Sequence, residues 1–147
     1  MLRLLNRLLG RGSPPPTFSM TTLDGAAAVV LNELRESTRS QMVAAGIAAQ
    51  PNLLQRDALC GYVRGLTDIV ATKRFSNEQG SENFFSSLAV DVGPWADPRE
   101  AVQQCEQHLA FANPAFVLGA QAGAADANDY LRGLPMCRLT AILHPLA

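Results

Sequence analysis

Apolar residues recur every three or four positions along most of this chain. The first long segment with this pattern contains Leu23, Ala27, Val30, Leu31 and Leu34. The second contains Leu59, Val63, Leu66, Ile69 and Val70. Side chains three and four residues apart lie on the same face of an α-helix. The pattern therefore predicts one helix over about residues 22–48 and another one after Pro51.

Two pairs of polar residues mark where these helices begin. Thr21 with Asp24, and Asn52 with Gln55, have the three-residue spacing of a capping box. In that arrangement the two side chains cap each other's backbone N–H groups at the start of a helix. We therefore expect helix starts just after Thr21 and just after Asn52.

Two prolines predict further helix starts. Pro98 follows Asp97, and Pro114 follows Asn113, so each proline stands at the first helical position behind a capping side chain. Gly133 suits the end of the second of these helices, because glycine readily adopts the left-handed conformation found just after a helix.

The predicted fold is all-α, an irregular bundle of about five to six helices over residues 21–147. A short helix after Ser81 belongs to it, as does a last one over residues 136–144, where a buried strand is the alternative. The predicted core consists of Leu34, Leu59, Val63, Leu66, Phe85, Leu88, Trp95, Leu109, Val117 and Leu131. The residues predicted to face solvent on the second helix are Arg56, Asp57, Arg64 and Asp68.

Small residues recur at four-residue spacing in two of the predicted helices. Gly61 and Gly65 lie on one, and Gly119, Gly123 and Ala127 lie on the other. Glycine inside a helix costs close to 1 kcal/mol relative to alanine, so close packing of backbones must compensate. We expect these two helices to pack directly against each other, rather than to form a face for self-association.

Composition narrows the class of protein. The chain of 147 residues has the length of one domain, a formal net charge of −1 and a pI near 6.1, with acidic and basic residues interleaved. It contains three cysteines without a CxxC pair, and no apolar run reaches the length of a membrane span. We expect a soluble protein of the cytoplasm or of a macromolecular assembly such as a virion, neither secreted nor transmembrane, and without nucleic-acid binding.

Residues with chemical potential give no site at the level of sequence. Cys105 and His108 are three residues apart, but a zinc site needs four ligands, so a buried cysteine beside a partly exposed histidine is the expected arrangement. Asp126 and Asn128 begin like a calcium loop, yet Leu131 stands where such a loop needs glycine. We predict no catalytic residue, no cofactor and no metal, and hence no enzyme.

The first ten residues form an amphipathic helix on a helical wheel. One arc carries Met1, Leu2, Leu4, Leu5, Leu8 and Leu9, and the other carries Arg3, Asn6, Arg7 and Arg11. Residues 11–20 then form a linker rich in glycine and proline, in which Pro14, Pro15 and Pro16 favour an extended backbone. The predicted organisation is therefore a terminal helix (1–10), a linker (11–20) and a helical domain (21–147).

This terminal helix has four interpretations. A mitochondrial transit peptide fits the absence of acidic residues from the first 23 positions. A membrane-surface anchor fits the basic and apolar arcs, although so short a helix binds lipid weakly. The helix can also fold back on its own domain. Finally, it can dock on another chain, with the predicted contact residues Leu2, Leu5, Leu8, Leu9, Arg3 and Arg7.

Docking on another chain is the interpretation that we carry forward. It predicts a non-enzymatic structural or interaction subunit of a larger assembly, such as a viral particle component or a bacterial accessory subunit, whose partners are other proteins or further copies of itself. A peripheral membrane-surface protein is the alternative. A small helical enzyme or cofactor-binding protein is a third hypothesis, which would require a concave pocket with polar groups around His108 or Cys105.

Overall fold

The computed structural model describes residues 24–47, 51–75, 78–95, 97–111 and 113–146. These residues form six α-helices and a final 3₁₀ turn: α2 (Asp24–Ala44), α3 (Leu53–Phe75), α4 (Glu78–Val92), α5 (Pro98–Phe111), α6 (Pro114–Leu131), α7 (Arg138–Leu143) and η1 (His144–Leu146). No strand occurs within these ranges, so the predicted all-α class is confirmed. The predicted terminal helix (1–10) and linker (11–20) lie outside the described residues.

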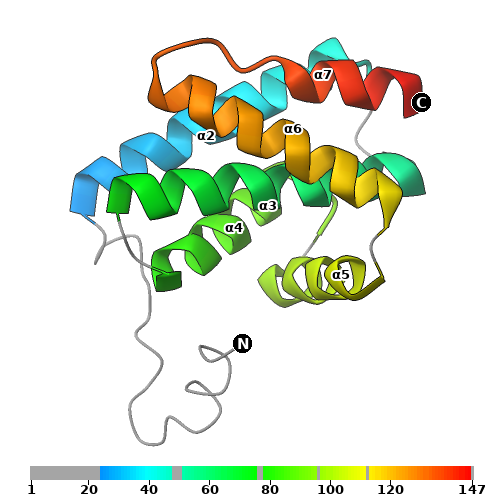
Figure 1. The fold of residues 1–147 in the computed structure, drawn as a ribbon, viewed down its shortest axis with the longest axis horizontal. Coiled ribbons are helices and arrows are strands. Elements are labelled where there is room, and N and C mark those ends of the chain that lie inside the picture. Colours follow the sequence, from blue (N-terminus) through cyan, green and yellow to red (C-terminus); the bar gives the residue numbers. More distant parts are fainter. Residues whose placement is uncertain (1–23, 48–50, 76–77, 96, 112, 147) are drawn as a thin grey trace, which may run out of the picture.

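Helices α3 and α6 cross the middle of the molecule, and the interface between them is the most extensive in the fold (Figure 1). Helix α4 packs on α3, and α5 lies at one end against α3 and α4. Helix α7 returns over α6 and also contacts α2. The first turn of α2 and the last turns of α3 and α6 meet at the opposite end of the molecule from α5 (Figure 1).

Four glycines bring the backbones of α3 and α6 together. A Cβ atom at Gly61 or Gly65 would come within 3.0 Å of the backbone of α6, and one at Gly119 or Gly123 would come as close to the backbone of α3. The contacted residues rise together along both helices, so α3 and α6 run parallel. The predicted direct packing of these two helices is confirmed.

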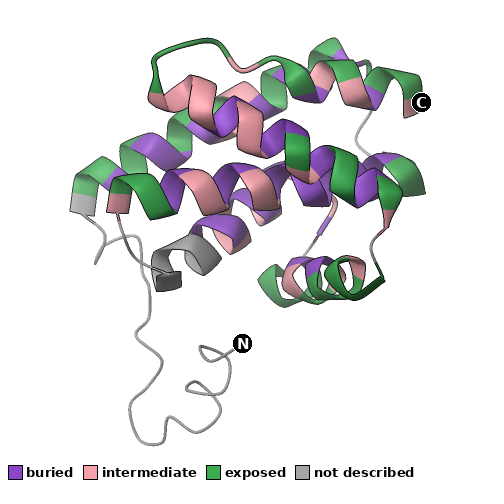
Figure 2. Cartoon of the chain, in the orientation of Figure 1, coloured by how far each residue is buried: buried purple, intermediate pink, exposed green. Residues whose placement is uncertain are grey.

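Buried residues follow the helix faces that meet inside the bundle (Figure 2). Most of the predicted core is confirmed. Leu34, Leu59, Val63, Leu66, Phe85, Leu88 and Trp95 are buried. Two core predictions were wrong, since Leu109 is 58% exposed and Val117 is 39% exposed. Leu131 is only partly buried. Leu109 follows Cys105 by one turn on the same face of α5. Ala101 and Cys105 are buried on that face, so its burial ends before it reaches Leu109.

The helix starts predicted at Asn52 and Asn113 are confirmed by their hydrogen bonds. The start predicted after Ser81 was wrong, because α4 begins earlier, at Glu78, and the start predicted after Thr21 lies outside the described residues. The backbone N–H of Asn52 donates to Gln55 Oε1 (3.0 Å), and the N–H of Gln55 donates to Asn52 Oδ1 (2.9 Å), which is a complete capping box. Asn113 Oδ1 accepts the N–H of Phe116 at the start of α6. Helix α2 ends at Ala44, earlier than predicted, because Gly46 turns the chain with φ = +74°.

Candidate functional site

The residues predicted to bind a partner do not fall within the described chain. Leu2, Leu5, Leu8, Leu9, Arg3 and Arg7 all lie before residue 24, so their placement is not described. The described part of the chain offers three other features of chemical interest: a cluster around Asp126, a cluster around Asp57, and a groove between α2 and α6.

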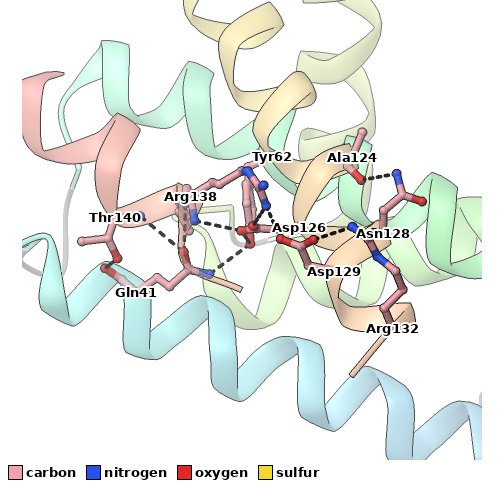
Figure 3. Close-up of polar contacts among 10 residues, drawn as sticks. Gln41, Tyr62, Ala124, Asp126, Asn128, Asp129, Arg132, Arg138 and Thr140 are labelled. Atoms are coloured by element: carbon pink, nitrogen blue, oxygen red, sulfur yellow. Dashed lines mark hydrogen bonds and ion pairs between the residues drawn. The ribbon is translucent and has the colours of Figure 1, made fainter. Parts of the chain in front are cut away.

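The Asp126 cluster consists of Gln41, Tyr62, Asp126 and Arg138 and joins α2, α3, α6 and α7 (Figure 3). The Tyr62 hydroxyl donates to Asp126 Oδ2 over 2.8 Å and accepts a hydrogen bond from Gln41 Nε2 over 3.0 Å. Arg138 donates to Asp126 twice, from its backbone N–H (3.1 Å) and from its guanidinium (2.9 Å). Asp126 and Tyr62 are both fully buried.

Burial and neighbouring charges both shift the pKa values of groups in this cluster. Burial, together with the neighbouring carboxylate of Asp126, raises the pKa of Tyr62. The guanidinium of Arg138 also bonds Asp129 and lowers the pKa of that carboxyl. Each carboxylate raises the pKa of Arg138 in return, with Asp129 the larger contributor. At neutral pH the Tyr62 hydroxyl therefore keeps its proton and donates it in the hydrogen bond to Asp126.

The Asp126 cluster fixes the C-terminal helix to the rest of the domain. Gln41 Oε1 accepts the backbone N–H of Leu139 (2.8 Å), which is one of the N–H groups at the start of α7 that no helical partner satisfies. Thr140 Oγ1 donates to the backbone carbonyl of Gln41. Arg138 forms ion pairs with both Asp126 and Asp129. Asp126, which begins the segment that resembles a calcium loop, therefore binds an arginine of the same chain.

The Asp57 cluster joins α3, α5 and the start of α6. Asp57 Oδ1 lies 2.8 Å from His108 Nε2 and 3.2 Å from Gln104 Nε2, and Asp57 Oδ2 accepts from Asn113 Nδ2 over 3.2 Å. Trp95 Nε1 donates to Gln104 Oε1 (2.6 Å). Asp57 is only 5% exposed, so the prediction that it faces solvent was wrong.

Two thiols lie next to the Asp57 cluster. Cys60 on α3 and Cys105 on α5 are both buried, and their side chains interact with each other. The hydrogen bond to Cys105, together with burial, raises the pKa of Cys60. The predicted arrangement of a buried Cys105 beside a partly exposed His108 is confirmed, since the His108 side chain is 15% exposed. A thiol with a raised pKa is a poor nucleophile.

A groove opens where α2 begins and α6 ends, and we call it the α2–α6 groove. Its volume is about 880 Å³. Its lining is mostly apolar, with Ala26, Val29 and Val30 from α2, Leu131 from α6, and Leu134 and Pro135 from the loop that follows. Glu33 and Arg74 supply one charge of each sign, and the Tyr130 hydroxyl donates to Glu33 Oε1 over 3.1 Å. Neither His108 nor Cys105 lines this groove.

Three comparisons bear on what the chain resembles, and none of them gives a family. Neither the protein-family models, nor the curated proteins, nor the solved structures compared with the chain match it. Within the ranges that the structure describes, no three His, Cys, Asp or Glu side chains are placed to hold a metal ion. None of the described helices combines the length and the apolar character that a membrane span requires.

Sequence reasoning missed both polar clusters. The Asp57 cluster had one signal, because Gln104 and His108 are four residues apart and therefore share a face of α5 with Cys105. The Asp126 cluster had none beyond an acidic residue that follows a run of small residues, since its partners Tyr62 and Gln41 are distant in sequence.

Proposed function

We propose that this protein is a non-enzymatic interaction subunit of a larger assembly and that it docks on a partner through its N-terminal amphipathic segment. The observation that carries the proposal is the pattern of residues 1–9, with a leucine arc opposed by Arg3 and Arg7, followed by a triple-proline linker. A tethered helix of this kind suits a hydrophobic groove on another protein.

The arrangement of the polar groups supports a role in binding rather than in catalysis. The carboxylates of Asp57 and Asp126 are buried, and each accepts hydrogen bonds from neighbours on other helices. These bonds hold helices together and keep both carboxylates away from solvent. The α2–α6 groove, in contrast, is lined mainly by aliphatic side chains.

Large apolar side chains are also exposed elsewhere on the surface, where a protein partner can contact them. Phe111 is 82% exposed, Leu53 is 71% exposed and Leu118 is 43% exposed. Aromatic side chains on a surface are typical of protein–protein contacts. We include these residues as secondary contact points of the proposed partner surface.

The test is affinity capture from the host cell, with the full chain compared to a variant in which Leu5 and Leu8 are replaced by glutamate. A variant with Asn6→Glu is the matched control, because it adds a negative charge to the polar arc of the same segment. The proposal expects a protein partner that binds the full chain and the control, and that is lost from the leucine variant. Circular dichroism establishes that all three proteins are equally helical.

Two outcomes would refute the proposal. Partner lists that do not change with the leucine variant would show that the segment does not dock. Binding of the full chain to vesicles with anionic lipid, lost in high salt and in the leucine variant, would establish the membrane-surface alternative when no protein partner depends on the segment.

A further inference from the structure

The α2–α6 groove leaves apolar side chains open to water. Val29 on its wall is 60% exposed, and Leu134 on the opposite rim is 50% exposed. A contiguous apolar surface of this kind usually marks a site of interaction. Such a groove fits a segment of this chain or of a partner.

The N-terminal segment carries apolar side chains that can pack against the apolar lining of the groove. Residues 1–9 carry a leucine arc and no acidic residue, and Arg3 and Arg7 flank that arc. The first eleven residues of α2 carry acidic side chains but no basic one. Glu33 and Arg74 both stand within the groove, so the charges of its lining balance. The complementarity is therefore mainly apolar, with Glu33 as the one carboxylate of the lining that an arginine of the segment can meet.

The tether makes the chain's own segment the favoured occupant. The described chain begins at Asp24, only two residues before Ala26 in the lining of the groove. Residues 10–23 connect the segment to that point, and a chain of that length spans at most about 50 Å. A short tether gives an effective concentration in the millimolar range, on the order of 1 mM, which free partners in a cell rarely match.

We propose that, in the absence of a partner, the chain's own residues 1–9 bind in the α2–α6 groove. The leucine arc packs against Val29, Val30 and Leu134, and Arg3 or Arg7 faces Glu33. A partner of the assembly must then displace the segment from the groove before it can bind. That second step rests on the proposed function, whereas the docking within one chain does not.

The test is amide hydrogen exchange of the full chain, followed at residues 25–31 and at residues 133–134. Leu5→Glu removes an apolar contact of the segment, and Asn6→Glu is its matched control. Val29→Glu places a charge in the groove, and Val43→Glu, at a position that is 76% exposed on the same helix, is the control for it. All four substitutions lie at surface positions or outside the described core, so the fold survives them.

The proposal expects exchange in the unmodified chain to be about tenfold slower than in Leu5→Glu or Val29→Glu, which corresponds to a docked form about 1.4 kcal/mol below the open one. Both control variants should exchange like the unmodified chain. The slow exchange should not depend on protein concentration, and light scattering should show a monomer.

Equal exchange in the unmodified chain and in Leu5→Glu would overturn the proposal. Slow exchange that appears only with a dimer would overturn it as well, because the occupant would then be a second copy. Failure here is distinguishable from failure of the proposed function. If capture of a partner depends on Leu5 and Leu8 but exchange is equal, docking in the groove is refuted while the proposed function is supported.

Discussion

Alanine in place of Gly119 tests whether direct backbone contact between α3 and α6 organises the fold. The new Cβ atom would lie 2.8 Å from the carbonyl carbon of Ala58, 2.9 Å from the amide nitrogen of Tyr62, and closer still to the carbonyl oxygen of Ala58. Carbon atoms in contact prefer separations of about 3.5–4.0 Å, so the two helices have to move apart by roughly 1 Å or more. Backbone atoms cannot rotate away as a flexible side chain would.

The expected loss follows from three contributions. Overpacking of a tight interface costs about 1–3 kcal/mol. The same movement strains the hydrogen bond between Tyr62 and Asp126, which contributes about 1 kcal/mol. Alanine has a higher helix propensity than glycine, and this difference offsets up to about 1 kcal/mol of the lost stability. We expect Gly119→Ala to lower the free energy of unfolding by about 2 kcal/mol, and the melting temperature by about 4–8 °C for a domain of this size.

Urea unfolding followed by tryptophan fluorescence measures this loss directly. Trp95 is the single tryptophan and is 2% exposed, so its emission reports on the folded core. Gly25→Ala in α2 is the control, because a Cβ atom there meets nothing within 4 Å and stability should stay equal or rise slightly. A Gly119→Ala protein as stable as the Gly25→Ala control would refute the close-contact argument.

Three further predictions concern tyrosine and cysteine side chains of the domain. Tyr62→Phe removes a hydrogen bond to Asp126 and should cost about 1–3 kcal/mol in urea unfolding, whereas an unchanged midpoint would contradict that role. Burial raises the pKa of Tyr130 to about 12, so stability should fall as the pH rises from about 10 to about 12, and tyrosinate absorbance in the folded protein at about pH 10 would contradict this. Cys137 is exposed while Cys60 and Cys105 are buried, so a thiol reagent should modify one thiol quickly and the other two only after unfolding or local opening.

The helix ends could be predicted because the information for them is local. A capping box such as that of Asn52 and Gln55 closes within three residues, and its hydrogen bonds depend on no other helix. The turn at Gly133, with φ = +76°, follows from glycine's freedom at positive φ. Such features survive any arrangement of the helices in space.

The position of a helix face in the bundle could not be predicted in the same way. Asp57 was expected to face solvent because charged residues usually do, but it meets Gln104 and Asn113, which are 47 and 56 residues further along the chain. Leu109 was assigned to the core for its apolar character, yet the side of α5 that faces α3 presents Gln104 and His108 to that carboxylate. The spacing of apolar residues within one helix gives no information about the polar side chains that another helix brings into contact with it.

This polar interface makes the attachment of α5 sensitive to a single substitution. Only Ala101 and Cys105 of α5 are buried, so the bonds from Gln104 and His108 to Asp57 carry much of its attachment. Asp57→Ala leaves those donors without their acceptor, at a cost of about 1–3 kcal/mol. Since 1.4 kcal/mol corresponds to about tenfold, local opening of α5 should become about tenfold more frequent or more. Cys105 should then react with a thiol reagent faster by the same factor, while the helical signal at neutral pH stays unchanged. Thiol reactivity that rises only in proportion to global unfolding would show instead that α5 opens together with the rest of the bundle.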